Sequence, residues 1–91
     1  DAMKLCGTAY DPTTGRFMEV TTTEPGMQLY TANHMNGSLI GKGGKAYGKH
    51  AAFCLETQHY PDSPNKPQFP STVLEPGKKF SSQTVHKFSA K

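Results

Sequence analysis

The chain has 91 residues, of which 34% are hydrophobic, and its formal net charge is +3. A chain of this length can form one small domain, which buries only roughly 60% of the surface that its unfolded form exposes, so we expect a marginal core. No apolar run approaches membrane-spanning length and no signal-peptide pattern is present, so we expect no membrane partner.

Five segments alternate apolar and polar residues with the period of two that is typical of β-strands. In chain order, the predicted strands span residues 4–10, 16–23, 27–31, 51–57 and 80–89. The first two form a hairpin, because Pro12 and Gly15 stand where turn geometry favours them. Two Glu-Pro-Gly turns, at 24–26 and 75–77, divide the rest of the chain. Short strands at such regular spacing indicate an all-β sandwich or barrel.

Two segments do not fit the strand pattern. Residues 36–45 contain four glycines and are predicted to form a mobile loop. Residues 58–70 contain four prolines, and proline lacks the backbone donor that a central strand needs. Within this second segment, Tyr60 and Phe69 favour an ordered irregular loop over a disordered linker.

The two cysteines, Cys6 and Cys54, lie in apolar runs. They form no Cys-x-x-Cys pair, and neither has a His at zinc-finger spacing. We therefore expect two buried free thiols of an intracellular, cytoplasmic protein, with no metal site.

A loose basic stretch contains Lys42, Lys45 and Lys49, with Tyr47 as its only aromatic residue. Nucleic-acid binding would need a basic patch with stacking aromatics, or a known binding module. A solvated loop explains the stretch at least as well, so we expect no nucleic-acid partner.

The strand at 51–57 is the most apolar in the chain and ends in a carboxylate. Because side chains alternate in a strand, Phe53 and Leu55 form a core face and Glu56 lies on the opposite face. Desolvation at the end of an apolar strand would raise the pKa of Glu56 and make it a general base. The alternative, which composition alone favours, is an exposed strand end or an ion pair with a Lys.

The residues around Glu56 resemble the signature of the aldose 1-epimerase (galactose mutarotase) family, in which LETQ is followed by PD..N.P.FP. The matching positions are Leu55–Gln58, Pro61-Asp62, Asn65, Pro67 and Phe69-Pro70. Three further segments are similar to family motifs: residues 23–33 (T..PG.Q.YT.N), 10–16 (YDP.SGR) and 74–77 (L.PG). The resemblance covers nearly the whole chain, in order and with the right gaps.

This resemblance implies that residues 1–91 supply the C-terminal strands of a single large antiparallel β-sandwich, the galactose mutarotase-like supersandwich. The remaining strands would come from upstream polypeptide, in the same or a second chain. It also implies an isomerase that interconverts the α and β anomers of hexoses such as galactose and glucose. Such ring opening needs no metal or redox cofactor, and we expect none.

Three residues carry the implied site. Glu56 would be the base that takes the proton of the anomeric hydroxyl, and Gln28 would contact sugar hydroxyls. Tyr30 shares a face with Gln28 and is a candidate for lining the cleft. For Gln28 the alternative is an amide bonded to neighbouring backbone, and for Tyr30 it is a core aromatic.

An acid within reach of the ring oxygen is also required. In the family this acid is a His, assisted by a second His and an Asp, and all three come from strands upstream of the matching region. The His residues here fall on none of those motifs: His34, His50, His59 and His86. A dyad of Glu56 and His59 is a possible alternative, but their side chains diverge along a strand, so we interpret His59 as a surface or loop histidine. The segment alone is therefore predicted to be inactive.

Two other functions remain open from the sequence. The first is a non-catalytic, carbohydrate-binding mutarotase-like protein, which would lack the upstream His residues. The second is a stand-alone all-β interaction module, which would fold without any further polypeptide.

Overall fold

A tight hairpin opens the chain, and Asp11 organises its turn. The computed structural model describes residues 2–91, and in it β1 (Lys4–Asp11) pairs antiparallel with β2 (Arg16–Thr22). The Asp11 carboxylate accepts hydrogen bonds from the hydroxyl of Thr13 at 2.7 Å, the backbone N–H of Thr13 at 3.0 Å and the hydroxyl of Thr14 at 2.9 Å. These bonds, led by the one from the Thr13 hydroxyl, lower the pKa of Asp11. Gly15 closes the turn at φ 79°, a backbone angle that favours glycine.

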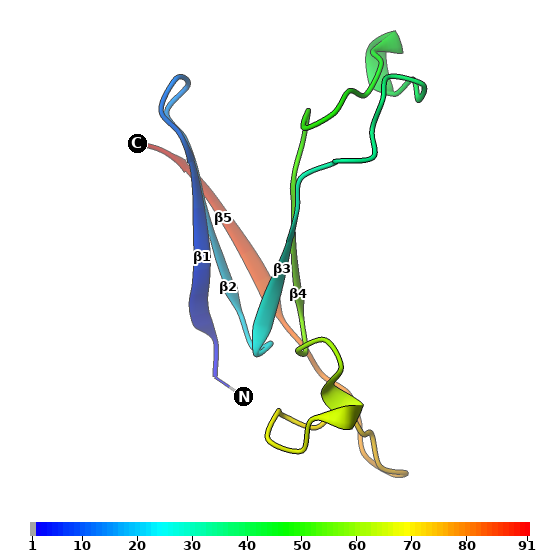
Figure 1. Ribbon diagram of the computed structural model, residues 1–91. Helices are drawn as coiled ribbons and strands as arrows, with labels where there is room; N and C mark the ends of the chain where they lie inside the picture. The colour runs from blue at the N-terminus through cyan, green and yellow to red at the C-terminus, as the bar shows by residue number, and fades with distance from the viewer. Residues whose placement is uncertain (1) are drawn as a thin grey trace.

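The strand β5 (Thr84–Ala90) adds to the other edge of β2, so that the sheet has the order β1-β2-β5 with antiparallel pairing throughout. The central strand provides the fully buried side chains, Val20 and Thr22. Figure 1 shows that the chain's C-terminal strand returns to lie beside the N-terminal hairpin.

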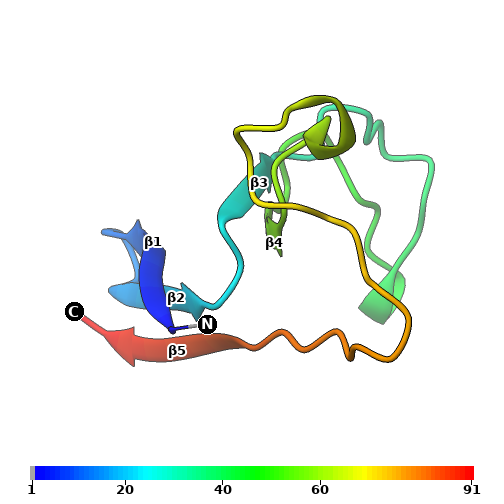
Figure 2. The same ribbon diagram turned by 90° about the horizontal axis from the view of Figure 1, so that it is seen from below.

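A second sheet consists of β3 (Gly26–Tyr30) and β4 (Cys54–Gln58), paired antiparallel. The two sheets meet where β2 runs into β3 and spread apart from that end (Figure 1). Figure 2, seen from below, also shows β3 and β4 standing apart from the three-stranded sheet, with the segment before β5 leading back to it.

Long loops complete the chain, with the short 3-10 helices η1 (Lys42–Gly44) and η2 (Ser63–Asn65) inside them. The described helices are single turns, and none has the length and apolar character needed to cross a membrane. The proline-rich loop is held by an edge contact between the rings of Tyr60 and Phe69, whose centroids are 5.1 Å apart. The prediction of an ordered irregular loop is thus confirmed.

The buried core is very small. Among residues 2–91, the buried hydrophobic residues are Val20 and Ala32, whereas Phe88 is 73% exposed and Phe80 is 66% exposed. The radius of gyration is 16.9 Å, whereas a compact domain of this length has about 12 Å. The exposed apolar side chains, such as Phe80 and Phe88, are not covered by any other part of the described chain.

The predicted all-β antiparallel class is confirmed, with corrections at strand ends. The fourth strand begins at Cys54 and not at Ala51, because its partner β3 ends at Tyr30. The last strand begins at Thr84 and not at Phe80, because its ladder with β2 ends at the pair Thr22–Thr84. In both cases the alternation of apolar and polar residues continues beyond the segment that pairs with a neighbouring strand.

Candidate functional site

The ladder between β3 and β4 brings the three predicted site residues together. Gln28 stands directly opposite Glu56, and Tyr30 directly opposite Cys54. Directly opposed residues of an antiparallel pair share a face, with Cβ atoms about 4.5–5.5 Å apart. The predicted base and the predicted sugar-binding amide are therefore immediate neighbours on one face.

This face points away from the three-stranded sheet. Thr57, which follows Glu56 and so points to the opposite face, reaches Thr84 of β5 with its hydroxyl at 2.8 Å. Glu56 and Gln28 are both exposed, and Tyr30 is 36% exposed. The expectation that Glu56 is desolvated is not met within this chain, because none of its described elements covers this face. The predicted core residue Phe53 is also exposed, at 51%.

The polar contacts around the pair are few. Within residues 2–91, Glu56 makes no hydrogen bond or ion pair, so the alternative of a Lys partner is not realised there. The Gln28 amide donates to the carbonyl oxygen of Leu29 at 3.2 Å. A hollow of about 480 Å³ lies near the end of the β3–β4 pair. Its lining includes Leu29 and Thr31, which belong to the face opposite to that of Gln28 and Glu56. The described chain thus presents one wall, without enclosing a cleft around Glu56.

The pair nevertheless has a clear chemical capacity. A carboxylate accepts hydrogen bonds or a proton, whereas a carboxamide both donates and accepts. Placed side by side, Glu56 and Gln28 can engage neighbouring hydroxyl groups of one polyhydroxylated ligand. No group of three or more metal-binding side chains occurs in the part of the chain that the structure describes.

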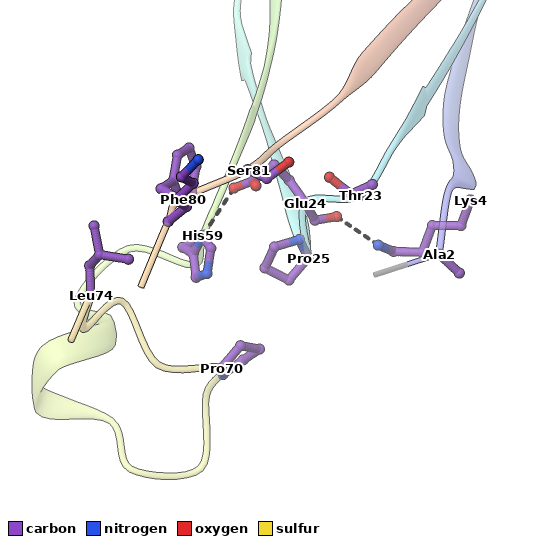
Figure 3. A pocket seen from close by; sticks show the side chains of 11 residues that line it. Ala2, Lys4, Thr23, Glu24, Pro25, His59, Pro70, Leu74, Phe80 and Ser81 are labelled. Atoms are coloured by element: carbon purple, nitrogen blue, oxygen red, sulfur yellow. Dashed lines mark hydrogen bonds and ion pairs between the residues drawn. The ribbon is translucent and has the colours of Figure 1, made fainter. Parts of the chain in front are cut away.

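A buried polar joint lies where the two sheets meet, and sequence reasoning missed it. Glu24, in the turn before β3, is only 8% exposed. Its Oε1 lies 3.0 Å from Nδ1 of His59, and its Oε2 accepts a hydrogen bond from the hydroxyl of Ser82 at 2.8 Å. Figure 3 shows Glu24 and His59 pointing toward each other beside a hollow of about 470 Å³. The only local signal was Glu-Pro-Gly, which indicates a turn and no long-range partner.

The interpretation of His59 as a surface or loop histidine is confirmed, because His59 lies in the loop that follows β4, although its pairing with Glu24 was not predicted. Its side chain is 29% exposed. The proposed divergence from Glu56 is consistent with this pairing. Elsewhere, His50 bonds to Asn33 at 2.6 Å and His86 stacks on Phe88.

Three threonine hydroxyls form a second link at the joint. Thr84 Oγ1 lies 3.0 Å from Thr22 Oγ1 and 2.8 Å from Thr57 Oγ1. The Thr22 hydroxyl also donates to the carbonyl oxygen of Gln83 at 3.0 Å. The chain of hydroxyls joins β2, β5 and β4, and it ends on the residue next to Glu56.

The cysteines are free, as predicted, but their predicted burial is wrong. Cys6 is half-buried, with its thiol 3.2 Å from the carbonyl oxygen of Val20. Cys54 is exposed, because it lies on the uncovered face of β4 opposite Tyr30. Lys42, Lys45 and Lys49 are exposed, as a solvated loop requires.

The chain is similar in sequence to a known protein family and to several known proteins. The profile of the aldose 1-epimerase family matches residues 1–87. The chain is 49% identical to the galactose mutarotase of Rattus norvegicus over 86 residues, which are 94% of this chain and 25% of that protein. It is 48% identical to the galactose mutarotase of Homo sapiens over 85 residues, 93% of this chain and 25% of that protein.

A bacterial relative is similar over a shorter stretch. The aldose 1-epimerase of Escherichia coli strain K12 is 36% identical over 75 residues, which are 80% of this chain and 21% of that protein. The chain thus spans about a quarter of the length of the curated relatives that it matches.

Proposed function

The chain belongs to the aldose 1-epimerase family, and from this membership we propose that it is the C-terminal part of a single mutarotase-like β-sandwich domain. Its upstream partner strands lie in the same or a second polypeptide. Two observations support this proposal: the chain spans a quarter of its relatives' length, and large apolar side chains such as Phe88 have no cover. The proposed strands would cover these faces and close the sugar cleft.

The complete protein, in this proposal, interconverts the α and β anomers of hexoses such as galactose and glucose. The observation that carries it is the direct cross-strand pairing of Gln28 with Glu56. Gln28 binds sugar hydroxyls, Tyr30 lines the cleft, and Glu56 is the base. The upstream strands exclude water from this face when they cover it.

The reaction is a reversible ring opening. Glu56 removes the proton of the C1 hydroxyl, and a carbonyl forms at C1 while the bond from C1 to the ring oxygen breaks. The electron pair of that bond stays on the ring oxygen, which takes a proton from an acid within hydrogen-bond reach. The open-chain aldehyde rotates about C1–C2, and the ring closes on the other face. Proton transfers alone balance this sequence, so no cofactor takes part.

The acid comes from the upstream part of the domain. The histidines whose contacts are described here are engaged away from Glu56, with Glu24, Asn33 and Phe88. Residues 1–91 are therefore inactive by themselves. The free state of both thiols favours a cytoplasmic location for the whole protein.

A non-catalytic, carbohydrate-binding protein is the second candidate. It is favoured by the exposure of Glu56 and by the lack of a His hydrogen-bonded to it within residues 2–91. Polarimetry of fresh α-glucose separates the two candidates. The enzyme proposal expects the complete protein to accelerate the change in optical rotation and the isolated segment to leave it at the buffer rate. Binding of galactose without any acceleration would reject the enzyme in favour of the binding protein.

A further inference from the structure

The strand pair that carries Gln28 and Glu56 is attached to the rest of the chain through the polar joint at its base. We propose that Glu24 and His59 form a positioning clamp, which holds the Glu56 carboxylate in the orientation needed for proton transfer. The proposal rests on the proposed function, because it assigns the clamp a role in that reaction. Glu24 and His59 are positioning residues, and neither is assigned contact with the sugar.

Glu24 is fully engaged at this joint. Its carboxylate bonds to His59 and Ser82, while its backbone N–H donates to the Thr22 hydroxyl at 3.1 Å. Its carbonyl oxygen accepts from the Lys4 ammonium at 2.7 Å (Figure 3). One nine-tenths-buried side chain thus joins the turn before β3, the end of β4 and the segment before β5.

The Glu24 carboxylate determines which nitrogen of the His59 ring carries a hydrogen. An ionised carboxylate only accepts hydrogen bonds, so Nδ1 of His59 carries the hydrogen that Glu24 receives. This assignment holds for the neutral ring and for the imidazolium. The clamp therefore needs a donor at the Nδ1 position and does not need a positive charge.

Two contacts hold the chain just after Glu56, one within β4 and one in the loop that follows it. Thr57, the next residue, bonds to Thr84 at 2.8 Å, and His59 bonds to Glu24 at 3.0 Å. A two-stranded ladder is marginally stable without further packing, so these contacts set the direction in which β4 leaves the joint. A displacement of about 1 Å at a reacting group can cost on the order of 10²-fold in rate.

The experiment uses steady-state mutarotation by the complete protein. We expect His59→Ala to lower kcat about 10-fold while KM changes less than about twofold, because the base is misplaced and hydroxyl binding is kept. His59→Asn, whose amide nitrogen stands near the Nδ1 position, should restore most of the lost kcat. His34→Ala is the matched control, since His34 is exposed in the loop that follows β3, at the end of the strand away from the joint.

Ser82→Ala keeps the test decisive if His59→Ala does not fold. It removes one hydrogen bond to the Glu24 carboxylate with little change in volume, and we expect a smaller fall in kcat at unchanged KM. An unchanged kcat in folded His59→Ala or Ser82→Ala, or failure of His59→Asn to restore activity, would overturn the clamp. Failure of the proposed function would look different: either the complete wild-type protein would not accelerate mutarotation at all, or Glu56→Gln would retain full activity.

Discussion

Gln28 and Glu56 face each other across the β3–β4 ladder, two pairs away from Tyr30–Cys54, with the Leu29–Leu55 pair between them. Their closeness is a property of the strand register, since a slip of one residue would turn one of the two side chains to the opposite face. The amide and the carboxylate can therefore reach the same ligand, and the proposed role of each can be tested by a separate kinetic effect.

Replacing Glu56 by Gln removes the proposed base and keeps the size of the side chain. A general base contributes about 10²–10⁴-fold to rate, so we expect polarimetry to show a loss of at least about 100-fold in kcat for the complete protein. Glu75→Gln, at an exposed turn, is the control and should keep full activity. A Glu56→Gln protein as fast as the wild type would exclude this carboxylate as the base.

Replacing Gln28 by Ala removes the proposed hydrogen bonds to sugar hydroxyls. A hydrogen bond contributes about 0.5–1.5 kcal/mol net, so KM should rise about 3- to 10-fold while kcat falls less. Gln68→Ala, exposed in the proline-rich loop, serves as the matched control. Unchanged KM values for both galactose and glucose would remove Gln28 from the binding site.

The thiol of Cys54 can be used to probe the face of the β3–β4 pair that carries Gln28 and Glu56. Because Cys54 lies opposite Tyr30 and on the side of Glu56, bound galactose should slow its alkylation in the complete protein. Cys6, half-buried beside Val20, is an internal reference whose modification should not respond to sugar. Mass spectrometry of the modified peptides measures both rates. Equal rates for Cys54 with and without saturating galactose would contradict the placement of the sugar on this face.

Thr22→Val tests the hydroxyl chain at the joint. The substitution keeps the shape of a fully buried side chain but leaves the Glu24 N–H without its acceptor and removes one of the two hydrogen bonds to the Gln83 carbonyl. We expect the free energy of unfolding of the complete protein to fall by about 1–3 kcal/mol in urea. Thr8→Val, on an exposed position of β1, should change it by less than about 0.5 kcal/mol.

The isolated segment should not behave as an independent domain. Its small buried core and its exposed apolar side chains predict poor chemical-shift dispersion in a ¹H–¹⁵N NMR spectrum, or aggregation through open sheet edges. Addition of the upstream part of the domain should restore dispersion. A dispersed spectrum from residues 1–91 alone would favour a stand-alone interaction module instead.

Several features were readable from the residues alone. Alternation with a period of two located all five strands, and Pro12 and Gly15 marked the first turn. The family signature around Leu55–Gln58 singled out Glu56 and Gln28, which the ladder then placed side by side. These features are local or depend on an ordered set of short motifs, so they can be read from the linear sequence.

Tertiary structure alone decided which residues became partners. The bond between Glu24 and His59 joins two turns that are distant along the chain, and no local pattern specifies it. Likewise, Cys54 sits in an apolar run yet is exposed, because burial depends on what covers a strand face and not on the strand's own composition. Alternation tells which side chains share a face, whereas only the folded chain determines what that face meets.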